Sequence, residues 1–278
     1  MNSYNSFYKT VKGSEGEKCY YPTRLDTYGK GCFNDCKYCY AKQLLDFRKL
    51  WNPTDVGIAP IDKIKKTIDK IPEGSVIRMG GMTDCFQPIE REIKNSFKTI
   101  EMLNKKNIHY LIVTKSSLIG EKEYLDVLDK NLAHIQISIP SNDNNILKQI
   151  EKAETFEKRK ETIEKLESKD FDISLRLSPF LYEKSNFDVI NSIDVTKCLV
   201  EFLRIKPSMA DNFESIIDFT KYEIKEGGYR HLPLNEKEKV IEKLDFEQIT
   251  VCDDVNEHYE YFKKYVNYNK NDCCNLSM

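Results

Sequence analysis

Three cysteines within eight residues carry the strongest chemical signal in this 278-residue sequence. Cys32, Cys36 and Cys39 have the spacing C-x3-C-x2-C and stand between a predicted strand and the start of a helical pattern. Soft sulfur ligands suit iron–sulfur centres, and three thiolates on one loop can hold three corners of a [4Fe–4S] cluster. The fourth iron would stay open, so this spacing predicts a cluster that also binds a substrate or a second cofactor.

Zinc is the main competing interpretation of the same cysteines. Zinc loops usually combine a C-x2-C pair with a second pair or with histidines further along the chain. The sequence has no second C-x2-C pair, and its four histidines do not lie at ligand spacing from one another. A chance group of structural cysteines is the other alternative, because nine cysteines in a chain without a secretion signal are more often ligands, nucleophiles or buried groups than disulfides.

Short apolar runs alternate along the chain with longer amphipathic stretches rich in Lys and Glu, which is typical of βα units and a parallel sheet. The predicted strands are Arg24–Tyr28, Val76–Met79, Ile108–Thr114, Ala133–Ile139, Phe171–Leu177 and Val195–Ile205. The predicted helices are Lys37–Leu50, Ile61–Ile71, Ile89–Asn104, Glu121–Asp129, Thr155–Ser168 and Phe213–Tyr222. Six such units are too few for a closed eight-fold barrel, so we expect a partial (β/α)6 barrel of the α/β class.

Two of the predicted strands have a polar face. Ala133–Ile139 places His134, Gln136 and Ser138 on one side, and Phe171–Leu177 places Asp172, Ser174 and Arg176 on one side. Parallel strands covered by helices normally read as continuous apolar runs, because both of their faces are buried. The alternation therefore predicts strands that line a polar cavity. An antiparallel sheet with one wet face would give the same pattern, but the intervening helices favour the cavity.

The rhythm of strands and helices changes after Gly227-Gly228. A helical stretch near Leu234–Leu244 and a short run Ile249–Cys252 lead to an aromatic helix, Glu257–Tyr268. We therefore expect a core of residues 1–226 and a C-terminal extension of residues 227–278 that packs on it. Cys252, Cys273 and Cys274 form a second cysteine group in this extension. They are interpreted as part of a packed or disordered tail, with hydrogen donation or binding of an auxiliary cluster as the alternatives.

The cysteine motif resembles that of the radical S-adenosylmethionine (SAM) superfamily, and the resemblance covers about the first 210 residues. It is most similar to the spore photoproduct lyase-like branch in three segments, Cys36–Ala41, Thr83–Glu90 and Thr114–Ser116. The resemblance implies a [4Fe–4S] cluster held by the three motif cysteines. It also implies that SAM is cleaved reductively at the open iron to methionine and a 5′-deoxyadenosyl radical, which abstracts a hydrogen atom from the substrate. The hard chemistry then belongs to the cofactors, which the protein orients and encloses.

The same resemblance suggests where SAM binds. Gly80-Gly81-Met82 ends the second strand, where the family has a glycine-rich segment that contacts the SAM amino group; an ordinary tight turn is the alternative. Lys115 and Ser116 at the end of the third strand are candidate partners of the SAM carboxylate. Ser138 and Arg176 are candidates for ribose or carboxylate contacts, or else members of an internal hydrogen-bond network.

Cys85 and Tyr40 are the candidate catalytic residues. Spore photoproduct lyases carry a hydrogen-donor cysteine a few residues before the aspartate of this second-strand loop, whereas here no cysteine precedes Asp84 and Cys85 follows it. Cys85 is therefore a displaced donor or a small buried hydrophobe. Tyr38 and Tyr40 match tyrosines beside the cluster in the lyases. The missing donor weakens an assignment to photoproduct repair, and Cys19 and Cys198 are interpreted as structural.

The composition excludes few partners. The formal net charge is -2, so no global basic field demands a nucleic acid. Lys63–Lys66 and Lys158–Lys160 could steer a phosphate backbone, but Lys/Glu-patterned helices more often present solvated faces. No apolar run is long enough to span a bilayer, and a cytoplasmic location is expected.

Two functions from different classes follow. The first is a radical SAM enzyme of lyase or transferase type, reduced by a flavodoxin or ferredoxin, with modified or damaged nucleic acid as the first substrate class to test. The second is a non-catalytic protein in which an iron–sulfur or zinc site stabilises the fold. In that case Lys115 and Ser138 would tolerate mutation.

Overall fold

The computed structural model describes residues 7–9, 21, 23–47, 49, 51–213 and 215–276, and Cys19 lies outside this part of the chain. Its centre is a sheet in the order β1-β2-β5-β6-β7-β8-β9-β12. The edge strand β1 (Phe7–Lys9) runs antiparallel to β2, and each later neighbour pairs in parallel. The parallel strands are β2 (Thr23–Leu25), β5 (Val76–Met79), β6 (His109–Thr114), β7 (Ala133–Ser138), β8 (Asp172–Phe180), β9 (Lys197–Phe202) and β12 (Gln248–Val251).

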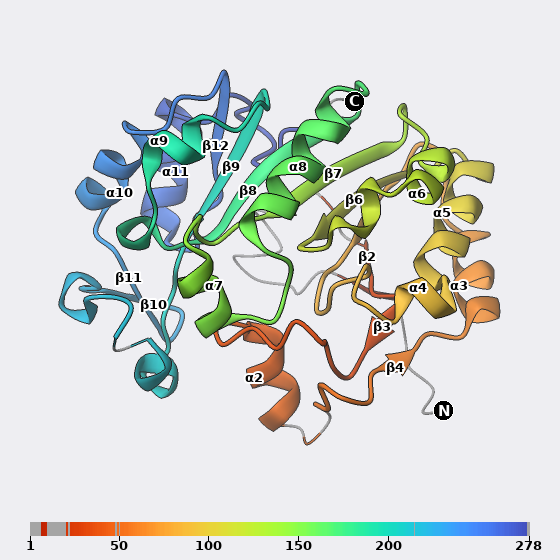
Figure 1. Cartoon of the computed structure of the whole chain (residues 1–278), viewed down its shortest axis with the longest axis horizontal. Coiled ribbons are helices and arrows are strands. Elements are labelled where there is room, and N and C mark those ends of the chain that lie inside the picture. The colour runs from red at the N-terminus through yellow and green to blue at the C-terminus, as the bar shows by residue number, and fades with distance from the viewer. Residues whose placement is uncertain are drawn as a thin grey trace.

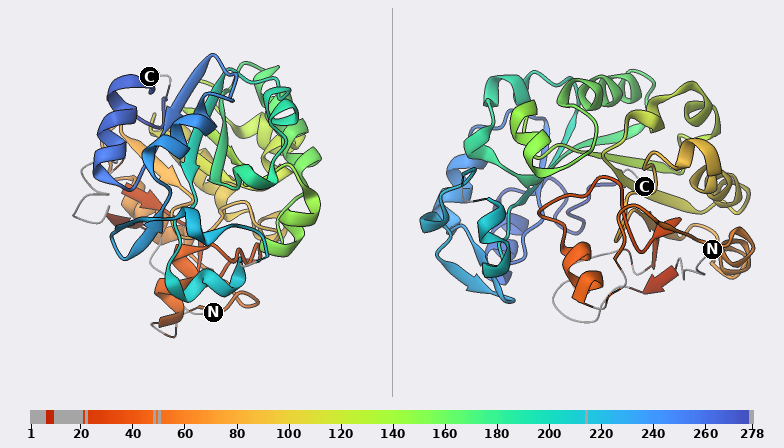
Figure 2. Two further views of the ribbon diagram at one scale, coloured as in Figure 1. Left: turned by 90° about the vertical axis from the view of Figure 1, so that its left-hand side faces the viewer. Right: turned by 60° about the horizontal axis from the view of Figure 1, so that its bottom comes forward.

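The strands form an open arc with helices along its outer side, which confirms the expected partial barrel (Figures 1 and 2). The number of strands was predicted wrongly: within the described residues the arc has seven parallel strands. The seventh is β12, which pairs with β9 although it comes from the segment assigned to the extension. The division at residue 227 stays a prediction, but residues 248–251 belong to the central sheet.

The helices form where the sequence has an N-cap residue or apolar residues at helical spacing. Thr155 caps α8 by accepting the N–H of Lys158, and Ile61, Ile64 and Ile68 turn one face of α3 inward. The helices are α2 (Tyr40–Phe47), α3 (Ile61–Ile68), α4 (Glu90–Ile93), α5 (Asn95–Lys105), α6 (Lys122–Val127), α7 (Asn144–Ile150), α8 (Phe156–Glu167), α9 (Phe187–Asn191), α10 (Leu234–Ile241) and α11 (Asn256–Tyr265).

One helix prediction needs correction, and two helices were not predicted. In place of the predicted helix Phe213–Tyr222, the described residues of this stretch are irregular apart from a short 3₁₀ turn at Phe219–Lys221. The helices α7 and α9 were not predicted, because each is too short to show a periodic apolar face. Two small antiparallel pairings complete the fold: β3 (Tyr28–Gly29) with β4 (Gly57–Ile58), and β10 (Ile224–Glu226) with β11 (Tyr229–His231).

The sheet separates a large apolar core from a smaller one. The large core fills the space between the sheet and the outer helices and includes Ile112, Ile135, Ile137 and Leu175. The smaller core contains Leu111 and Leu199 together with Tyr21, Cys273 and Cys274. Because Leu111 and Leu199 belong to strand faces opposite to the large core, the C-terminal residues lie against the inner face of the barrel.

The inner face is polar, as the strand alternation predicted. Arg24 on β2 pairs in register with Arg78 on β5, and Ser138 on β7 pairs with Arg176 on β8. Since these strands are parallel, the alternative of an antiparallel sheet with one solvent-exposed face is excluded. No helix in the described part of the chain is long and apolar enough to cross a membrane.

Candidate active site

The motif cysteines lie on the loop between β3 and α2. Cys32 and Cys36 are buried, and Cys39 is partly exposed. Backbone hydrogen bonds hold this loop to the far end of α7: the N–H of Lys37 donates to the carbonyl of Ile150 at 2.8 Å, and the N–H of Lys152 donates to the carbonyl of Asn34 at 2.7 Å. The cysteine loop is therefore fixed against the barrel (Figure 2).

One cavity of about 280 Å³ brings most of the predicted site together. All the predicted ligands and contact residues except Cys85 and Ser116 line it. These are Cys32, Cys36, Cys39, Tyr40, Gly80, Gly81, Met82, Lys115, Ser138 and Arg176. The segments that carry them are far apart in sequence, and they meet because the carboxyl ends of parallel strands lie at one edge of the sheet.

The spacing of the three motif thiols bears on the kind of metal centre. Three sulfurs around one tetrahedral zinc ion lie about 3.8 Å apart, as bonds of about 2.3 Å require. Among the described residues, Cys32, Cys36 and Cys39 do not form a group whose ligand atoms all lie within 4.8 Å of one another. The loop is therefore not preformed as a closed zinc site. Its all-sulfur donor set fits a multinuclear iron–sulfur cluster.

Without a metal these thiols hold their protons. Burial, with the Asp84 carboxylate nearby, raises the pKa of Cys32 to about 12. Burial also raises the pKa values of Cys36 and Cys39. Metal binding to the loop must therefore release protons, as expected for thiolate ligands.

The buried ion pair of Arg159 and Glu151 contacts the cysteine loop. The Glu151 carboxylate accepts hydrogen bonds from the Tyr38 hydroxyl and the Arg159 guanidinium, and the Cys36 thiol donates to it at 3.8 Å. Arg159 also donates to the carbonyl of Ser138 at 2.9 Å. The predicted surface role of Lys158–Lys160 is thus wrong for Arg159, which is fully buried. In Lys63–Lys66 the three lysines are exposed on α3, which agrees with a solvated face.

Lys115 places a cation at the cavity wall. Its ammonium lies 5.6 Å from the centre of the Tyr38 ring. Burial acts to lower the pKa of Lys115, but the acidic groups of Cys36, Glu151 and Asp84 raise it above its ordinary value. The side chain therefore stays charged and can pair with a carboxylate.

The glycine segment is shaped by Asp26. The buried Asp26 carboxylate accepts the N–H groups of Gly81 at 2.9 Å and of Met82 and Thr83 at 3.0 Å. Burial raises the pKa of Asp26 to about 6 despite these hydrogen bonds. The Tyr40 hydroxyl donates to the Gly81 carbonyl, so this predicted catalytic residue touches the predicted SAM segment.

Arg176 belongs to an internal hydrogen-bond network, whereas a contact of Arg176 or Ser138 with SAM stays a prediction. Each lines the cavity, yet Arg176 also pairs with Glu201 at 2.5 Å and donates to the side-chain oxygen of Gln136 at 2.5 Å. Glu201 has its pKa lowered to about 2, because Arg176 and a hydrogen bond from Ser178 outweigh the effect of burial. The pair belongs to an internal network that faces the cavity.

Two predicted site residues are corrected by the structure. Cys85 is buried in the large apolar core, and its thiol donates to the Leu25 carbonyl at 3.6 Å. It does not line the cavity. Of the two alternatives, this position fits a small buried hydrophobe and not a hydrogen donor. Ser116 caps the 3₁₀ turn Ser117–Gly120 by accepting the N–H of Leu118, and it does not line the cavity either.

The cysteines of the extension reach the same cavity. Cys252, Cys273 and Cys274 line it, so the tail is packed and lies inside the barrel. A hydrogen bond with Cys273 lowers the pKa of Cys274, and Arg176 and Arg78 lower it further. Cys198 is buried in the large core, in keeping with a structural role.

Several site residues escaped the sequence analysis. Arg24 and Arg78 line the cavity from neighbouring strands, and the polar break in Val76–Met79 was the signal that could have revealed Arg78. The Arg204 guanidinium lies 5.7 Å from the centre of the Tyr40 ring and 4.8 Å from the centre of the Tyr229 ring. No local pattern marks Arg204, since this group is assembled by the fold.

Comparison with known proteins agrees with this geometry. A family model described as the Radical SAM superfamily matches residues 27–193, more than half of the chain. No curated protein matches. The family model therefore identifies the family, and the solved structures show which folds are similar.

The fold is similar to solved structures of spore photoproduct lyase. A variant of that enzyme with bound AdoMet and dinucleoside spore photoproduct has a TM-score of 0.60 at 16% identity, covering 88% of this chain and 76% of the lyase. A second variant has a TM-score of 0.62 at 17% identity, covering 94% and 78%. At this identity the likeness concerns the fold alone. With the family match and the cysteine-lined cavity together, the chain belongs to the radical SAM superfamily.

Proposed function

We propose that this radical SAM enzyme binds its [4Fe–4S] cluster through Cys32, Cys36 and Cys39 and abstracts hydrogen from a substrate held in the barrel. As a member of the superfamily it uses a [4Fe–4S] cluster and SAM. The observation that carries the proposal is the single cavity where the cysteine loop, the glycine segment and Lys115 meet. A structural metal site would not need these groups around a common space.

Each wall of the cavity has a separate task. When bound, the cluster and SAM together supply a 5′-deoxyadenosyl radical, formed with methionine by one-electron reduction of SAM. Lys115 follows β6 and offers a positive charge to the SAM carboxylate, and Gly80–Met82 follows the neighbouring strand β5 and lines the same cavity. Asp26 holds three N–H groups of this turn, which fixes the orientation of its carbonyls.

The barrel interior protects a reactive radical from water. Leu111 and Leu199 form an apolar layer with Cys273 and Cys274 of the tail. The tail thereby fills part of the inner face, and the space left for a substrate is bounded on several sides. Exclusion of water prevents side reactions of reactive intermediates.

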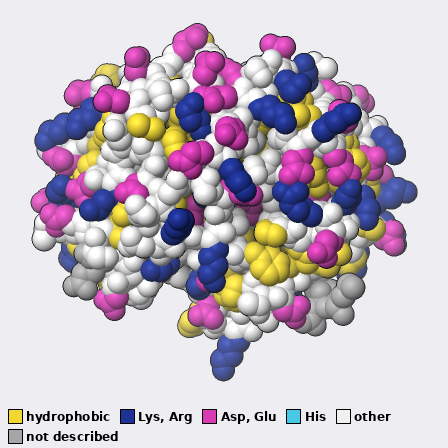
Figure 3. Space-filling view, viewed as in Figure 1, with side chains coloured by type: hydrophobic (Ala, Val, Ile, Leu, Met, Phe, Trp, Pro, Cys, Tyr) yellow, Lys and Arg dark blue, Asp and Glu magenta, His cyan; other side chains and the backbone are white. Residues whose placement is uncertain are grey.

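An aromatic and cationic group at the cavity favours a planar substrate. The rings of Tyr40 and Tyr229 both contact the Arg204 guanidinium, and the Lys206 ammonium lies 4.9 Å from the centre of the Tyr229 ring. Nucleobases stack on tyrosine rings and arginine planes in single-stranded recognition. A modified or damaged base in a nucleic acid is therefore the substrate class we propose. On the face in Figure 3, basic and acidic side chains are interspersed, so base contacts rather than a uniform charged surface would select it.

The remaining partners follow from the chemistry. Reduction of the cluster needs a one-electron donor, for which a flavodoxin or a ferredoxin is proposed. A cytoplasmic location stays a prediction, in keeping with the reduced cysteines that the site requires.

Electron paramagnetic resonance tests the reaction class. We expect anaerobically reconstituted, dithionite-reduced protein to give a [4Fe–4S] signal that SAM perturbs, and to form 5′-deoxyadenosine. Cys36→Ala removes a cluster ligand and should abolish both, whereas Cys198→Ala, a buried cysteine away from the cavity, should retain both. A colourless protein with stoichiometric zinc and no SAM cleavage would refute the proposal.

Product analysis tests the substrate class. Oligonucleotides with and without ultraviolet damage are added to the reconstituted enzyme, and 5′-deoxyadenosine is measured against time. We expect damaged DNA to raise the rate and Arg204→Gln to reduce that stimulation while basal SAM cleavage persists. Equal rates with damaged, undamaged and no DNA would exclude this substrate class and leave the SAM chemistry intact.

A further inference from the structure

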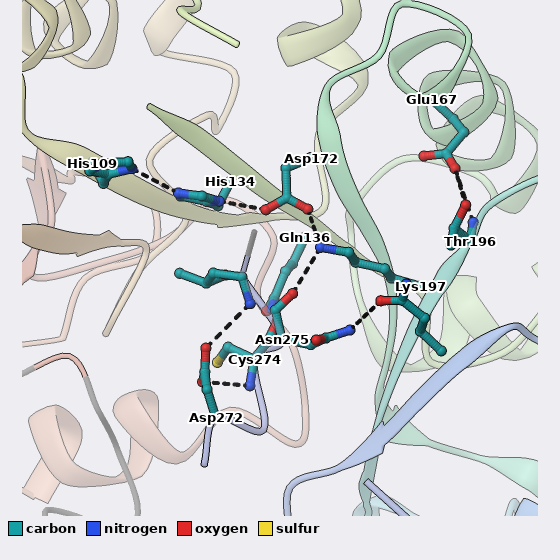
Figure 4. A network of polar contacts seen from close by, with 12 residues as sticks. His109, His134, Gln136, Glu167, Asp172, Thr196, Lys197, Asp272, Cys274 and Asn275 are labelled. Carbon is teal, nitrogen blue, oxygen red and sulfur yellow. Dashed lines mark hydrogen bonds and ion pairs between the residues drawn. The ribbon is translucent and has the colours of Figure 1, made fainter. Parts of the chain in front are cut away.

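The C-terminal residues 272–276 enter the barrel and are held there by its strands. The Thr250 hydroxyl donates to the Cys273 carbonyl at 2.7 Å, and the Gln136 amide donates to the Cys274 carbonyl at 3.3 Å. Lys197 donates to the Asn275 carbonyl at 2.9 Å and also pairs with Asp172 (Figure 4). The position of this segment is thus specified by contacts from β7, β9 and β12.

These contacts gather potential metal ligands at one point. One oxygen of Asp272 and the sulfurs of Cys273 and Cys274 all lie within 4.8 Å of one another. Cys252 adds a third thiol, which is hydrogen-bonded to Cys273. Adjacent cysteines in sequence rarely reach one metal, but here the two sulfurs lie close enough to each other and to the Asp272 oxygen to share one ion.

The carboxylate of this group is oriented in advance. The Tyr21 hydroxyl donates to Asp272 Oδ2 at 2.5 Å, and the N–H of Cys274 donates to Asp272 Oδ1 at 2.9 Å. Carboxylates that ligate metals are commonly held by such outer hydrogen bonds. The backbone bond also fixes Asp272 relative to the two cysteines.

The surroundings suit an anionic metal–thiolate centre. Arg176 and Arg78 are positive groups close enough to act on Cys274. Three thiolates and a carboxylate around a divalent cation carry excess negative charge, which these guanidinium groups offset. Buried charges persist only when they are paired or coordinate a metal.

We propose that Asp272, Cys273 and Cys274 form a second metal site, which Cys252 completes as a fourth ligand and which binds one Zn²⁺ ion. Sulfur ligands select soft or borderline metals, and tetrahedral sulfur-rich sets are typical of zinc and iron. The close spacing of Asp272, Cys273 and Cys274 fits a single ion and not a cubane. Both ligand sets line the same cavity, so this ion faces the substrate space of the enzyme.

Cobalt is the probe for this site, because Co²⁺ replaces zinc and absorbs light when bound to thiolates. The protein carries Cys32→Ser, Cys36→Ser and Cys39→Ser, so that the cysteine loop cannot bind the probe. We expect one equivalent of Co²⁺ to give a sulfur-to-cobalt charge-transfer band. Adding Cys273→Ser and Cys274→Ser should abolish the band, and Tyr21→Phe should weaken Co²⁺ binding by about tenfold through loss of the outer hydrogen bond.

Cys198→Ser is the matched control, because Cys198 is buried in the outer core away from the cavity. It should leave the charge-transfer band unchanged. A band that survives Cys273→Ser and Cys274→Ser, or cobalt bound without a thiolate band, would overturn the proposal.

A second measurement covers the case in which the triple-serine background does not fold. Zinc and iron are then counted in the full chain after anaerobic reconstitution. We expect one zinc per chain in the wild type and in Cys198→Ser, and none in Cys273→Ser/Cys274→Ser, with iron content equal in all three. Equal zinc contents in all three proteins would contradict the second site. A wild-type protein that binds no iron or forms no 5′-deoxyadenosine would contradict the proposed cluster and not the second site.

Discussion

Asp84 joins the cysteine loop to the sheet, because its Oδ2 accepts a hydrogen bond from the Asn34 amide at 3.1 Å. The same oxygen accepts the N–H of Lys115 at 2.9 Å, and Oδ1 accepts the Thr114 hydroxyl at 2.7 Å. One buried carboxylate thus sets the distance between the cluster ligands and the predicted SAM partner.

Replacing Asp84 by Asn tests this positioning role. The amide group must present its nitrogen to one of the donors that Asp84 accepts, so one contact becomes a clash of two donors. We expect Asp84→Asn to lower the rate of 5′-deoxyadenosine formation by about 10- to 100-fold, as for other residues that orient metal ligands. Rates are compared at equal iron content. Asp62→Asn on the exposed side of α3 is the control and should keep the wild-type rate.

A full rate in Asp84→Asn would mean that the loop is held without this carboxylate. A loss of iron with normal rates per cluster would instead assign Asp84 to cluster assembly.

The buried pair of Arg159 and Glu151 makes a prediction about stability. Both side chains are fully buried, and Arg159→Met would leave a buried carboxylate without its cation. Removal of one partner of such a pair costs about 3–5 kcal/mol. We therefore expect a large decrease in the free energy of unfolding, measured by urea denaturation. Lys158→Met removes an exposed pair with Glu154 on the same helix and should change the free energy of unfolding by less than about 1 kcal/mol. Similar midpoints for the two variants would contradict the structural role of Arg159.

The sequence was sufficient to predict the motif, six of the parallel strands and the polar inner face. These features are local: a cysteine spacing, a run of β-branched residues or an alternation with period two needs no knowledge of distant contacts. Ser138 and Arg176 could be assigned to a cavity for this reason, since the side chains on the polar face of each strand were predicted correctly.

Features that depend on distant contacts were not predictable in the same way. The strand β12 has four residues and reads like any short apolar run. Arg159 has the composition of an exposed helix, and its burial follows from Glu151 and the Ser138 carbonyl on other elements. Cys85 follows Asp84 directly, yet Cys85 lies in the large core and Asp84 lines the cavity.

The position of Cys85 predicts a variant with nearly normal chemistry. Cys85→Ala removes a buried thiol that contacts the Leu25 carbonyl and leaves the cavity walls in place. We expect 5′-deoxyadenosine formation within about twofold of the wild type and a loss of about 1–2 kcal/mol in unfolding free energy, in the range of small core truncations. The assay is run with the damaged oligonucleotide, because a hydrogen donor would be needed for product formation. Normal SAM cleavage with loss of a repaired product would restore the donor role of Cys85.

The raised pKa of Asp26 predicts a dependence of stability on pH. Its folded-state pKa of about 6 exceeds the ordinary value of 3.8, so the folded protein binds more protons than the unfolded chain between these values. The contribution of Asp26 is therefore fully present below about pH 4 and is lost as the pH rises through about 6. One pKa unit corresponds to about 1.4 kcal/mol, so the loss is about 3 kcal/mol.

Asp26→Asn separates this effect from other titrating groups. Free energies of unfolding of the wild type and the variant are measured across this pH range. The wild type should lose stability relative to Asp26→Asn as the pH rises, and the difference should be constant above about pH 7. A difference that does not change with pH would show that Asp26 titrates near its ordinary value.

Gly80 and Gly74 form a matched pair for the last prediction. Both have positive φ, +86° and +73°, and both donate a backbone hydrogen bond to another segment. A Cβ at Gly80 would lie 2.4 Å from the Val113 carbonyl oxygen, whereas a Cβ at Gly74 has nothing within 4 Å. Alanine at either position costs about 1–2 kcal/mol for the left-handed backbone.

Only Gly80→Ala must also push β5 away from β6, next to the segment that we propose for SAM. We therefore expect it to be less stable than Gly74→Ala in urea denaturation and to have a higher KM for SAM, while Gly74→Ala keeps the wild-type KM. If both variants lose the same stability and retain the same KM, the close approach of Gly80 to Val113 does not shape the site, and the glycine serves only the turn.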